Sequence, residues 1–230
     1  MATPSLHRDG PVLAAGAPLP EARAAVVMLH GRGATAESIL SLSDVLPGED
    51  IAYLAPQAIG GSWYPHSFLA PIESNEPWLT SSLEAVVDLV SRIEAAGIPP
   101  QRIALLGFSQ GACLALEYAA RHARRWGGVI GFSGGLIGPD GTPRDYGGSL
   151  DGTPVFLGCS DVDAHIPKAR VEESASVLER LGGVVTMRLY PGMGHTVNAD
   201  EIGFAGALLA GLLANSQPAS PQRAHGDAGR

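Results

Sequence analysis

Residues 102–125, RIALLGFSQGACLALEYAARHARR, contain the pattern that decides the fold. The apolar run at 102–107 is typical of a buried strand, and the run rich in alanine and leucine at 111–125 is typical of a helix. Between them, GFSQG at 107–111 matches G-x-S-x-G, in which a serine occupies a sharp turn from a strand into a helix. Side chains at the flanking glycine positions would clash in such a turn. Ser109 is therefore predicted to be a nucleophile at the end of a strand.

The same pattern occurs a second time, as GFSGG at 131–135 with Ser133 at its centre. A chance match is unsurprising in a chain with 30 glycines, so the surrounding sequence has to separate the two. Ser133 also follows a predicted strand, but the residues after it, GLIGPDGTP, are poor helix formers. We interpret Ser133 as a loop residue and keep Ser109 as the nucleophile.

Outward from this segment, apolar runs alternate with helical patterns. This alternation predicts βαβ units, and hence an α/β fold with a mostly parallel central sheet and helices on both faces. Active sites of such sheets lie at the carboxyl ends of the strands, so catalytic residues should follow strands directly. Further strands are predicted at 24–30, 51–56, 127–132, 153–159 and 184–190, and helices at 38–45, 79–93, 167–181 and 200–213, the last with Asp200 as its N-cap.

The chain of 230 residues is predicted to form one domain with two dissimilar ends. Residues 21–214 form the predicted domain, because hydrophobic residues make up 45% of the chain and no linker interrupts them. Residues 1–20, rich in proline, alanine and glycine, are predicted to be an N-terminal arm or an edge strand. The polar residues 215–230 are predicted to be a disordered tail.

The composition excludes several classes of partner. A net charge of −8 and a pI of about 5.3 disfavour binding to nucleic acid. No apolar run reaches the roughly 18 residues of a membrane span. The N-terminus lacks the basic and apolar regions of a secretion signal, so a cytoplasmic location is expected. Cys113 and Cys159 lie in apolar stretches and are interpreted as buried free thiols.

A serine hydroxyl needs a base, and the chain order predicts which histidine supplies it. In enzymes with this serine turn, the order is serine, then an acidic residue, then histidine. His195 lies in a glycine-rich loop, YPGMGHTV, between the last strand and the last helix, and is predicted to be the base. His122 is interpreted as a solvated residue within a helix. The acid should follow the strand at 153–159, where Asp161 and Asp163 both qualify.

Two backbone N–H groups should stabilise the charge that develops on the carbonyl oxygen during acyl transfer. One belongs to Gln110, the residue after the nucleophile, and the other comes from the loop HGRGAT at 30–35, where we predict Arg32. The side chain of Arg32 could steer an anionic substrate, although a solvated guanidinium is the simpler interpretation. His30 is interpreted as structural.

With these residues in view, the sequence resembles the phospholipase/carboxylesterase family, which includes the acyl-protein thioesterases. The resemblance runs from about Ala24 to Leu213 and rests on VVMLHGRG, APQ, GFSQGACLALEYA, D-x-x-I-P and GMGH, in that order. It implies an α/β-hydrolase fold and assigns the triad acid to the D-x-x-I-P aspartate, which is Asp163. It also supports Arg32 and Gln110 as the oxyanion donors and implies no metal and no cofactor.

Residues 61–79, GSWYPHSFLAPIESNEPWL, depart from the form typical of eukaryotic thioesterases and look like the variant found in bacterial esterases of the family. Their large side chains are predicted either to line the substrate pocket, to form a short lid, or simply to pack. His165, two residues past Asp163, is a further pocket candidate. The pocket candidates are Trp63, Tyr64, His66, Phe68, Trp78 and His165.

The sequence thus predicts a metal-free serine carboxylesterase that acts through an acyl-enzyme on small-molecule esters, with thioesters and lysophospholipids as further candidates. One alternative is a lactone or dienelactone hydrolase, although dienelactone hydrolases carry cysteine where this chain has Ser109. Another is an inactive binding protein of the same fold, which usually lacks a triad member. The sequence is compatible with a monomer or a homo-oligomer. With a histidine base, kcat/KM should rise with pH through about 6.5, the value of free imidazole.

Overall fold

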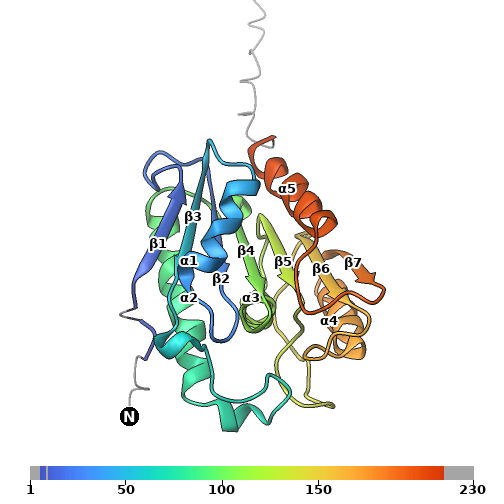
Figure 1. Cartoon of the computed structure of the whole chain (residues 1–230). Coiled ribbons are helices and arrows are strands. Elements are labelled where there is room, and N and C mark those ends of the chain that lie inside the picture. The colour runs from blue at the N-terminus through green and yellow to red at the C-terminus, as the bar shows by residue number, and fades with distance from the viewer. Residues whose placement is uncertain (1–5, 9, 215–230) are drawn as a thin grey trace, which may run out of the picture.

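The protein, described here from a computed structural model covering residues 6–8 and 10–214, is built around a seven-stranded sheet. The strand order is β1-β3-β2-β4-β5-β6-β7; β1 runs antiparallel to β3, and every other neighbouring pair is parallel (Figure 1). The predicted mostly parallel α/β fold is confirmed. The strands are β1 (Val12–Gly16), β2 (Ala24–Leu29), β3 (Ile51–Pro56), β4 (Ile103–Phe108), β5 (Gly128–Phe132), β6 (Pro154–Ser160) and β7 (Val184–Tyr190).

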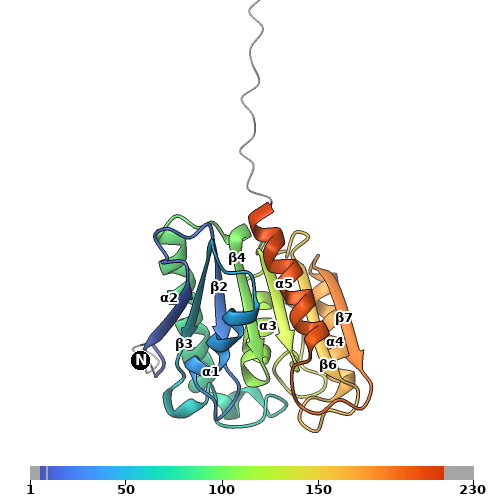
Figure 2. The ribbon, with the colours of Figure 1, turned by 45° about the horizontal axis from the view of Figure 1, so that its top comes forward.

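Helices cover both faces of the sheet, as Figure 2 shows. Side chains alternate across a strand, so Val27 and Leu29 of β2 pack into one core with α2, α3 and α4. Val26 and Met28 pack into a second core with α1 and α5 on the other face. The helices are α1 (Ala36–Leu40), α2 (Trp78–Ala95), α3 (Gln110–Arg121), α4 (Lys168–Arg180) and α5 (Ala199–Ala214), with 3₁₀ turns at Ser41–Val45, Ile59–Gly61, Ile72–Asn75 and Pro100–Arg102.

Helix α3 ends four residues earlier than predicted. It stops at Arg121, and His122 is the C-cap rather than a residue within the helix. The His122 ring stacks on the Tyr118 ring with 4.4 Å between centroids, and its Nδ1 lies 3.2 Å from the Tyr118 carbonyl oxygen. His122 is exposed, but its ring is held by the last turn of the helix.

The N-cap predicted for the last helix is wrong by two residues. The Asn198 Oδ1 accepts the N–H of Glu201 at 2.9 Å, and the Glu201 Oε2 accepts the N–H of Asn198 at 2.8 Å. This reciprocal pair is a capping box, which satisfies two donors at the helix start. Asp200 lies in the first turn instead and pairs with Arg188 at 2.5 Å.

The predictions for the two ends of the chain have different outcomes. Residues 12–16, within the predicted arm, form the edge strand β1, whereas the predicted tail at 215–230 lies outside the described residues. Cys113 and Cys159 are buried free thiols. Across the described part of the chain, no helix combines the length and the apolar character needed to span a membrane.

Candidate active site

Ser109 sits between the last residue of β4 and the first residue of α3, in a strained backbone conformation with φ 54° and ψ −119°. The glycines around it are required by close packing. A Cβ on Gly107 would lie 2.3 Å from the Gly111 carbonyl carbon, and one on Gly111 would lie 2.0 Å from the Leu29 carbonyl oxygen. The two glycines of the pattern are therefore required for steric reasons. Without a Cβ at these positions, the start of α3 and the end of β2 can pack directly against the serine turn.

His195, in the loop between β7 and α5, lies next to this serine. Its Nε2 is 2.8 Å from the Ser109 Oγ, and its Nδ1 is 2.7 Å from the Asp163 Oδ2. The imidazole packs against the Phe108 ring, with 5.0 Å between centroids, and its side chain is 20% exposed. The three predicted side chains, which are widely separated in the chain, thus meet at one edge of the sheet.

Asp163 follows β6, and its side chain is fully buried. Its Oδ1 accepts the backbone N–H groups of His165 at 2.8 Å and Ile166 at 3.0 Å. Burial raises the pKa of Asp163, but the hydrogen bonds from His195 and from these two amides outweigh it, so the pKa lies below its ordinary value. The carboxylate therefore remains ionised beside the imidazole.

Asp161, the other candidate acid, occupies a different position. Its Oδ1 accepts the N–H of Gly192 at 2.8 Å, in the loop that carries His195. Residue spacing cannot tell which of two aspartates in one loop is the triad acid, but the positions of their side chains can. Asp163 contacts the imidazole, and Asp161 holds the backbone of the histidine loop.

The loop that contains Arg32 lies directly against the serine turn. A Cβ on Gly31 would be 3.4 Å from the Ser109 Cβ, so this glycine allows the close approach. His30 is fully buried; its Nε2 accepts the Ala58 N–H at 3.1 Å, and its Nδ1 lies 2.8 Å from the Gly31 oxygen. Burial lowers the pKa of His30, as expected for a neutral structural histidine.

Gln110 begins α3, where the first N–H groups of a helix have no partner within the helix. Its side chain points to the aromatic segment, which the sequence motif did not indicate. The Gln110 Oε1 accepts the Trp63 N–H at 3.0 Å, and the Nε2 donates to the Tyr64 oxygen at 2.8 Å. The amide side chain thus fixes the backbone of residues 63 and 64.

The side chain of Arg32 is tied to the same segment. Its guanidinium donates to the Ser62 Oγ at 3.1 Å, to the Pro65 oxygen at 2.8 Å and to the His66 oxygen at 2.6 Å. The interpretation as a solvated guanidinium is therefore incomplete. Arg32 is exposed, but three hydrogen bonds hold it at the rim of the site.

A cavity of about 580 Å³ opens onto Ser109 and His195. Tyr64, His66, Phe68 and His165 line it, as four of the six predicted pocket residues, and the His165 ring meets the His195 ring edge-on at 4.8 Å. The other lining residues are Arg32, Pro65, Ser67, Gln110, Cys113 and Ile166.

The two tryptophans do not line this cavity. Trp63 is fully buried, and its Nε1 donates to the His30 oxygen at 2.9 Å. The Trp78 ring packs against the His7 ring with 5.5 Å between centroids. Both tryptophans are packing residues, which is the simplest of the three roles considered for the segment.

Cys113 is a lining residue that the sequence pattern placed only in the core. It lies four residues after Ser109, its N–H donates to the Ser109 carbonyl oxygen at 3.0 Å, and both side chains line the cavity. Burial raises the pKa of its thiol to about 12, which keeps it protonated near neutral pH. It therefore forms part of the cavity wall and is a poor nucleophile.

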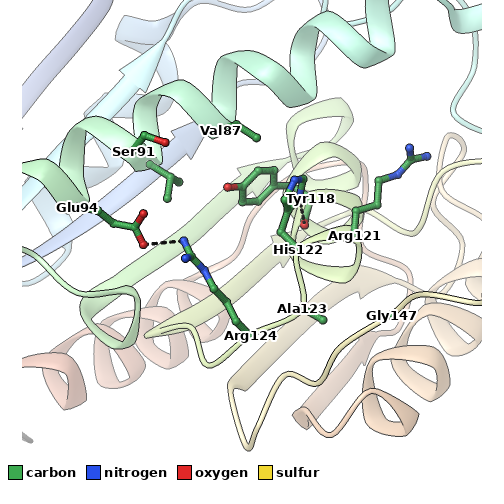
Figure 3. Close-up of a pocket in the computed structure, with 10 residues that line it drawn as sticks. Val87, Ser91, Glu94, Tyr118, Arg121, His122, Ala123, Arg124 and Gly147 are labelled. Atoms are coloured by element: carbon green, nitrogen blue, oxygen red, sulfur yellow. Dashed lines mark hydrogen bonds and ion pairs between the residues drawn. The ribbon is translucent and has the colours of Figure 1, made fainter.

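A second hollow, of about 380 Å³, lies at the opposite end of α3 and is shown in Figure 3. Its charged groups are paired with one another or with the helix: Arg124 contacts Glu94 at 2.8 Å, and Arg121 contacts Glu117 at 2.7 Å. It holds no counterpart of the serine, histidine and aspartate cluster. Within the described residues, no group of three or more His, Cys, Asp or Glu side chains is arranged to hold a metal ion.

A mostly parallel sheet with a strained serine after β4, an aspartate after β6 and a histidine after β7 defines the α/β-hydrolase class of serine hydrolases. The sequence model described as Phospholipase/Carboxylesterase matches residues 14–211. The chain belongs to this family and is therefore a serine hydrolase of carboxylic esters. The family predicted from the motifs is confirmed, and nothing in the matches favours the lactonase or inactive alternatives.

Solved structures and curated proteins agree with this family. The crystal structure of a phospholipase/carboxylesterase from Dyadobacter fermentans is 45% identical with a TM-score of 0.85, covering 91% of this chain and 99% of that one. The acyl-protein thioesterase 1 of Saccharomyces cerevisiae is 27% identical over 83% of this chain and 93% of its own length. The acyl-protein thioesterase 1 of Gibberella zeae is 34% identical, and that match spans about half of each chain, 53%.

Proposed function

We propose that the protein hydrolyses small-molecule carboxylic esters through an acyl-enzyme on Ser109, with His195 as the base and Asp163 as the acid that orients it. The observation that carries this proposal is the continuous pair of hydrogen bonds, 2.8 Å from Ser109 to His195 and 2.7 Å from His195 to Asp163. These distances suit proton transfer between hydroxyl and imidazole.

In the acylation step, the His195 Nε2 takes the proton of Ser109 while the Oγ attacks the carbonyl carbon of the ester. The carbonyl oxygen becomes negative and accepts hydrogen bonds from the backbone N–H groups of Arg32 and Gln110. Each such donor is worth roughly 3 kcal/mol in the transition state. His195 then protonates the leaving alcohol or thiol, and Asp163 stabilises the imidazolium without taking its proton.

In the deacylation step, His195 takes a proton from water, and the resulting hydroxide attacks the acyl carbon. The same two N–H groups hold the second oxyanion, and the proton returns to Ser109 as the carboxylic acid leaves. The carboxylate of Asp163 is available throughout because its pKa lies below its ordinary value.

The cavity supports a substrate of modest size. Its volume of about 580 Å³ fits an ester of drug-like dimensions, and its wall is mixed, with Phe68 and Ile166 beside His66 and His165. Thioesters remain candidates because relatives of this chain are acyl-protein thioesterases. We also propose a cytoplasmic location, which the two free thiols support, and no nucleic-acid partner, which the charge of −8 supports.

The acyl-enzyme itself provides the test. Incubating the protein with 4-nitrophenyl acetate and quenching within seconds should give a burst of nitrophenol and an acetyl group on the peptide that contains Ser109. His195→Ala should abolish the burst, because no base remains to activate the hydroxyl. An acetyl group on Ser133 or Cys113 in place of Ser109, or no release of nitrophenol by the native protein at saturating ester, would contradict the proposal.

A further inference from the structure

The side chain of Arg32 leaves part of its hydrogen-bonding capacity unused at the cavity. A guanidinium carries five N–H donors in a planar arrangement. The Nη1 donates to Ser62 and Pro65, and the Nη2 donates once, to His66. The Nε–H and one Nη2–H remain, and no acceptor for them is present among the described residues. The Nε and Nη2 atoms lie on the same side of the guanidinium, and a side of this kind can bind a carboxylate through both oxygens.

The surroundings of this edge favour a negative group. The described residues that line the cavity include no Asp or Glu, although the chain as a whole carries a net charge of −8. His66 and His165 line the same cavity, and the Tyr64 ring lies beneath the guanidinium at 5.9 Å from its centroid. An anion that enters here meets a cation and polar groups, while the rest of the protein is acidic.

The tether also makes the arginine an efficient binding group. An arginine normally loses much side-chain freedom when it closes on a ligand, and that loss weakens binding. In this protein, three hydrogen bonds to residues 62–66 already hold the guanidinium at the cavity. A carboxylate would meet a group that is fixed in place, so little further ordering is required.

We infer that the ester substrate carries a carboxylate group, which the free edge of the Arg32 guanidinium binds inside the cavity. This inference rests on the proposed function and adds the chemical class of its substrate. The backbone N–H of Arg32 holds the reacting carbonyl, and its side chain binds the carboxylate. The length of one arginine side chain therefore sets the spacing between the two groups, a distance of a few methylene units.

The test compares esters that differ in one charge. Monoethyl adipate and ethyl hexanoate have acyl chains of equal length, and 4-acetoxybutyrate and butyl acetate have alcohol chains of equal length. The two pairs place the carboxylate on the acyl side or on the alcohol side. We expect kcat/KM to favour the anionic member of at least one pair by roughly 10- to 100-fold, the range for a charged hydrogen bond.

Arg32→Gln should remove this preference, so that the ratio of kcat/KM values within the pair falls to about one. The ratio is the readout because a general loosening of residues 62–66 acts on both esters of a pair, whereas loss of the carboxylate contact acts on the anionic ester alone. Arg32→Lys keeps the charge but not the paired donors, and should restore part of the preference. If Arg32→Gln fails to fold, the salt dependence of the native protein provides the test. Its preference for the anionic ester should shrink between about 20 mM and 500 mM NaCl.

Three outcomes would overturn the inference: no anionic preference in either pair, a preference that survives in Arg32→Gln, or one that is unchanged by salt. Each leaves the hydrolase proposal standing, because the neutral esters are still cleaved. Failure to cleave any of the four esters would instead count against the hydrolase proposal itself.

Discussion

The segments GFSQG and GFSGG share more than their letters. They end the neighbouring strands β4 and β5, whose register pairs Phe108 with Phe132. Ser109 and Ser133 have almost the same φ, 54° and 50°. Each serine N–H also donates to the next strand, at 2.9 Å to the Phe132 oxygen and at 2.7 Å to the Gly158 oxygen. The strained serine turn is therefore a property of these strand ends and occurs twice.

The two turns differ in the segment that comes after the serine. After Ser109 the helix α3 begins at once, and the hydroxyl faces His195 and the cavity. Ser133 is fully buried and leads into a loop, and Gly134 packs so tightly on α3 that a Cβ there would lie 2.4 Å from the Ala112 Cβ. A G-x-S-x-G match therefore identifies a turn, whereas access and a base identify a nucleophile.

The strongest test of this comparison exchanges each serine for alanine. Ser109→Ala should lower kcat by at least about 10⁴-fold, because the attacking atom is lost and only the oxyanion donors and binding remain. Ser133→Ala should change kcat by less than about 3-fold, since that hydroxyl does not reach the cavity. Steady-state kinetics on one ester would measure both. A loss of more than about 100-fold in correctly folded Ser133→Ala would contradict the distinction between the two serines.

The two aspartates of the following loop form the next pair. Asp163→Asn should lower kcat by roughly 10³- to 10⁴-fold, because an amide no longer holds the imidazole in the required tautomer. Asp161→Asn keeps an oxygen that can accept the Gly192 N–H and should cost less than about 10-fold. Equal losses in the two variants, measured with the fold verified by circular dichroism, would contradict the assignment.

The glycine behind the first serine turn should affect stability more than chemistry. Gly111→Ala places a Cβ 2.0 Å from the Leu29 oxygen, so we expect a loss of roughly 3 kcal/mol or more in the free energy of unfolding. Gly203→Ala is the matched control. It lies exposed in α5 with no atom within 4 Å of the new Cβ, and it should add about 1 kcal/mol, as alanine favours a helix. Urea denaturation compares the two variants.

A smaller effect concerns the buried Glu201, which lies against Gly158 close to the turn that contains Ser133. Burial and the nearby Asp200 charge raise the Glu201 pKa from 4.5 to about 7, despite the opposing hydrogen bond from the Asn198 amide. Below about pH 4.5 this side chain is protonated in both the folded and unfolded states. Between about pH 4.5 and pH 7, Glu201 keeps its proton only in the folded state. The free energy of unfolding therefore falls as the pH rises through this range, by on the order of 3 kcal/mol in total.

Glu201→Gln should lack this slope, because a glutamine side chain does not ionise. The difference in unfolding free energy between the variant and the native protein should therefore shift in favour of the variant as the pH rises from about 4.5 to 7, and then level off. Urea titrations at several pH values measure the shift. A difference that stays constant with pH would show that Glu201 ionises equally in both states.

The sequence was sufficient wherever a residue's position follows from the end of a strand. Ser109 and His195 were predicted in this way, because parallel strands bring their carboxyl ends to one edge of the sheet. Asp163 needed the family resemblance, since two aspartates within three residues occupy the same strand end. Their roles differ only in side-chain direction, which residue spacing does not specify.

Irregular segments were predicted less well for a related reason. Residues 61–79 contain only a short 3₁₀ turn before α2, and without a period there is no rule for which aromatic faces the cavity. Tyr64 and Phe68 line it, whereas Trp63 and Trp78 pack elsewhere. The predicted N-cap of α5 was wrong because asparagine and aspartate are both good caps. The reciprocal hydrogen bonds between Asn198 and Glu201 decide in favour of Asn198 over Asp200.

The double attachment of residues 62–66 has a consequence for how this enzyme can change. Arg32 and Gln110, whose backbone N–H groups we propose as the oxyanion donors, also bind this stretch through their side chains. A shift in its main-chain path would displace both amides together with the cavity wall that residues 64–66 form, so it would disturb turnover and substrate binding at once. New specificities are therefore more accessible through side-chain exchanges, as at His66 and Ser67, than through insertions or deletions.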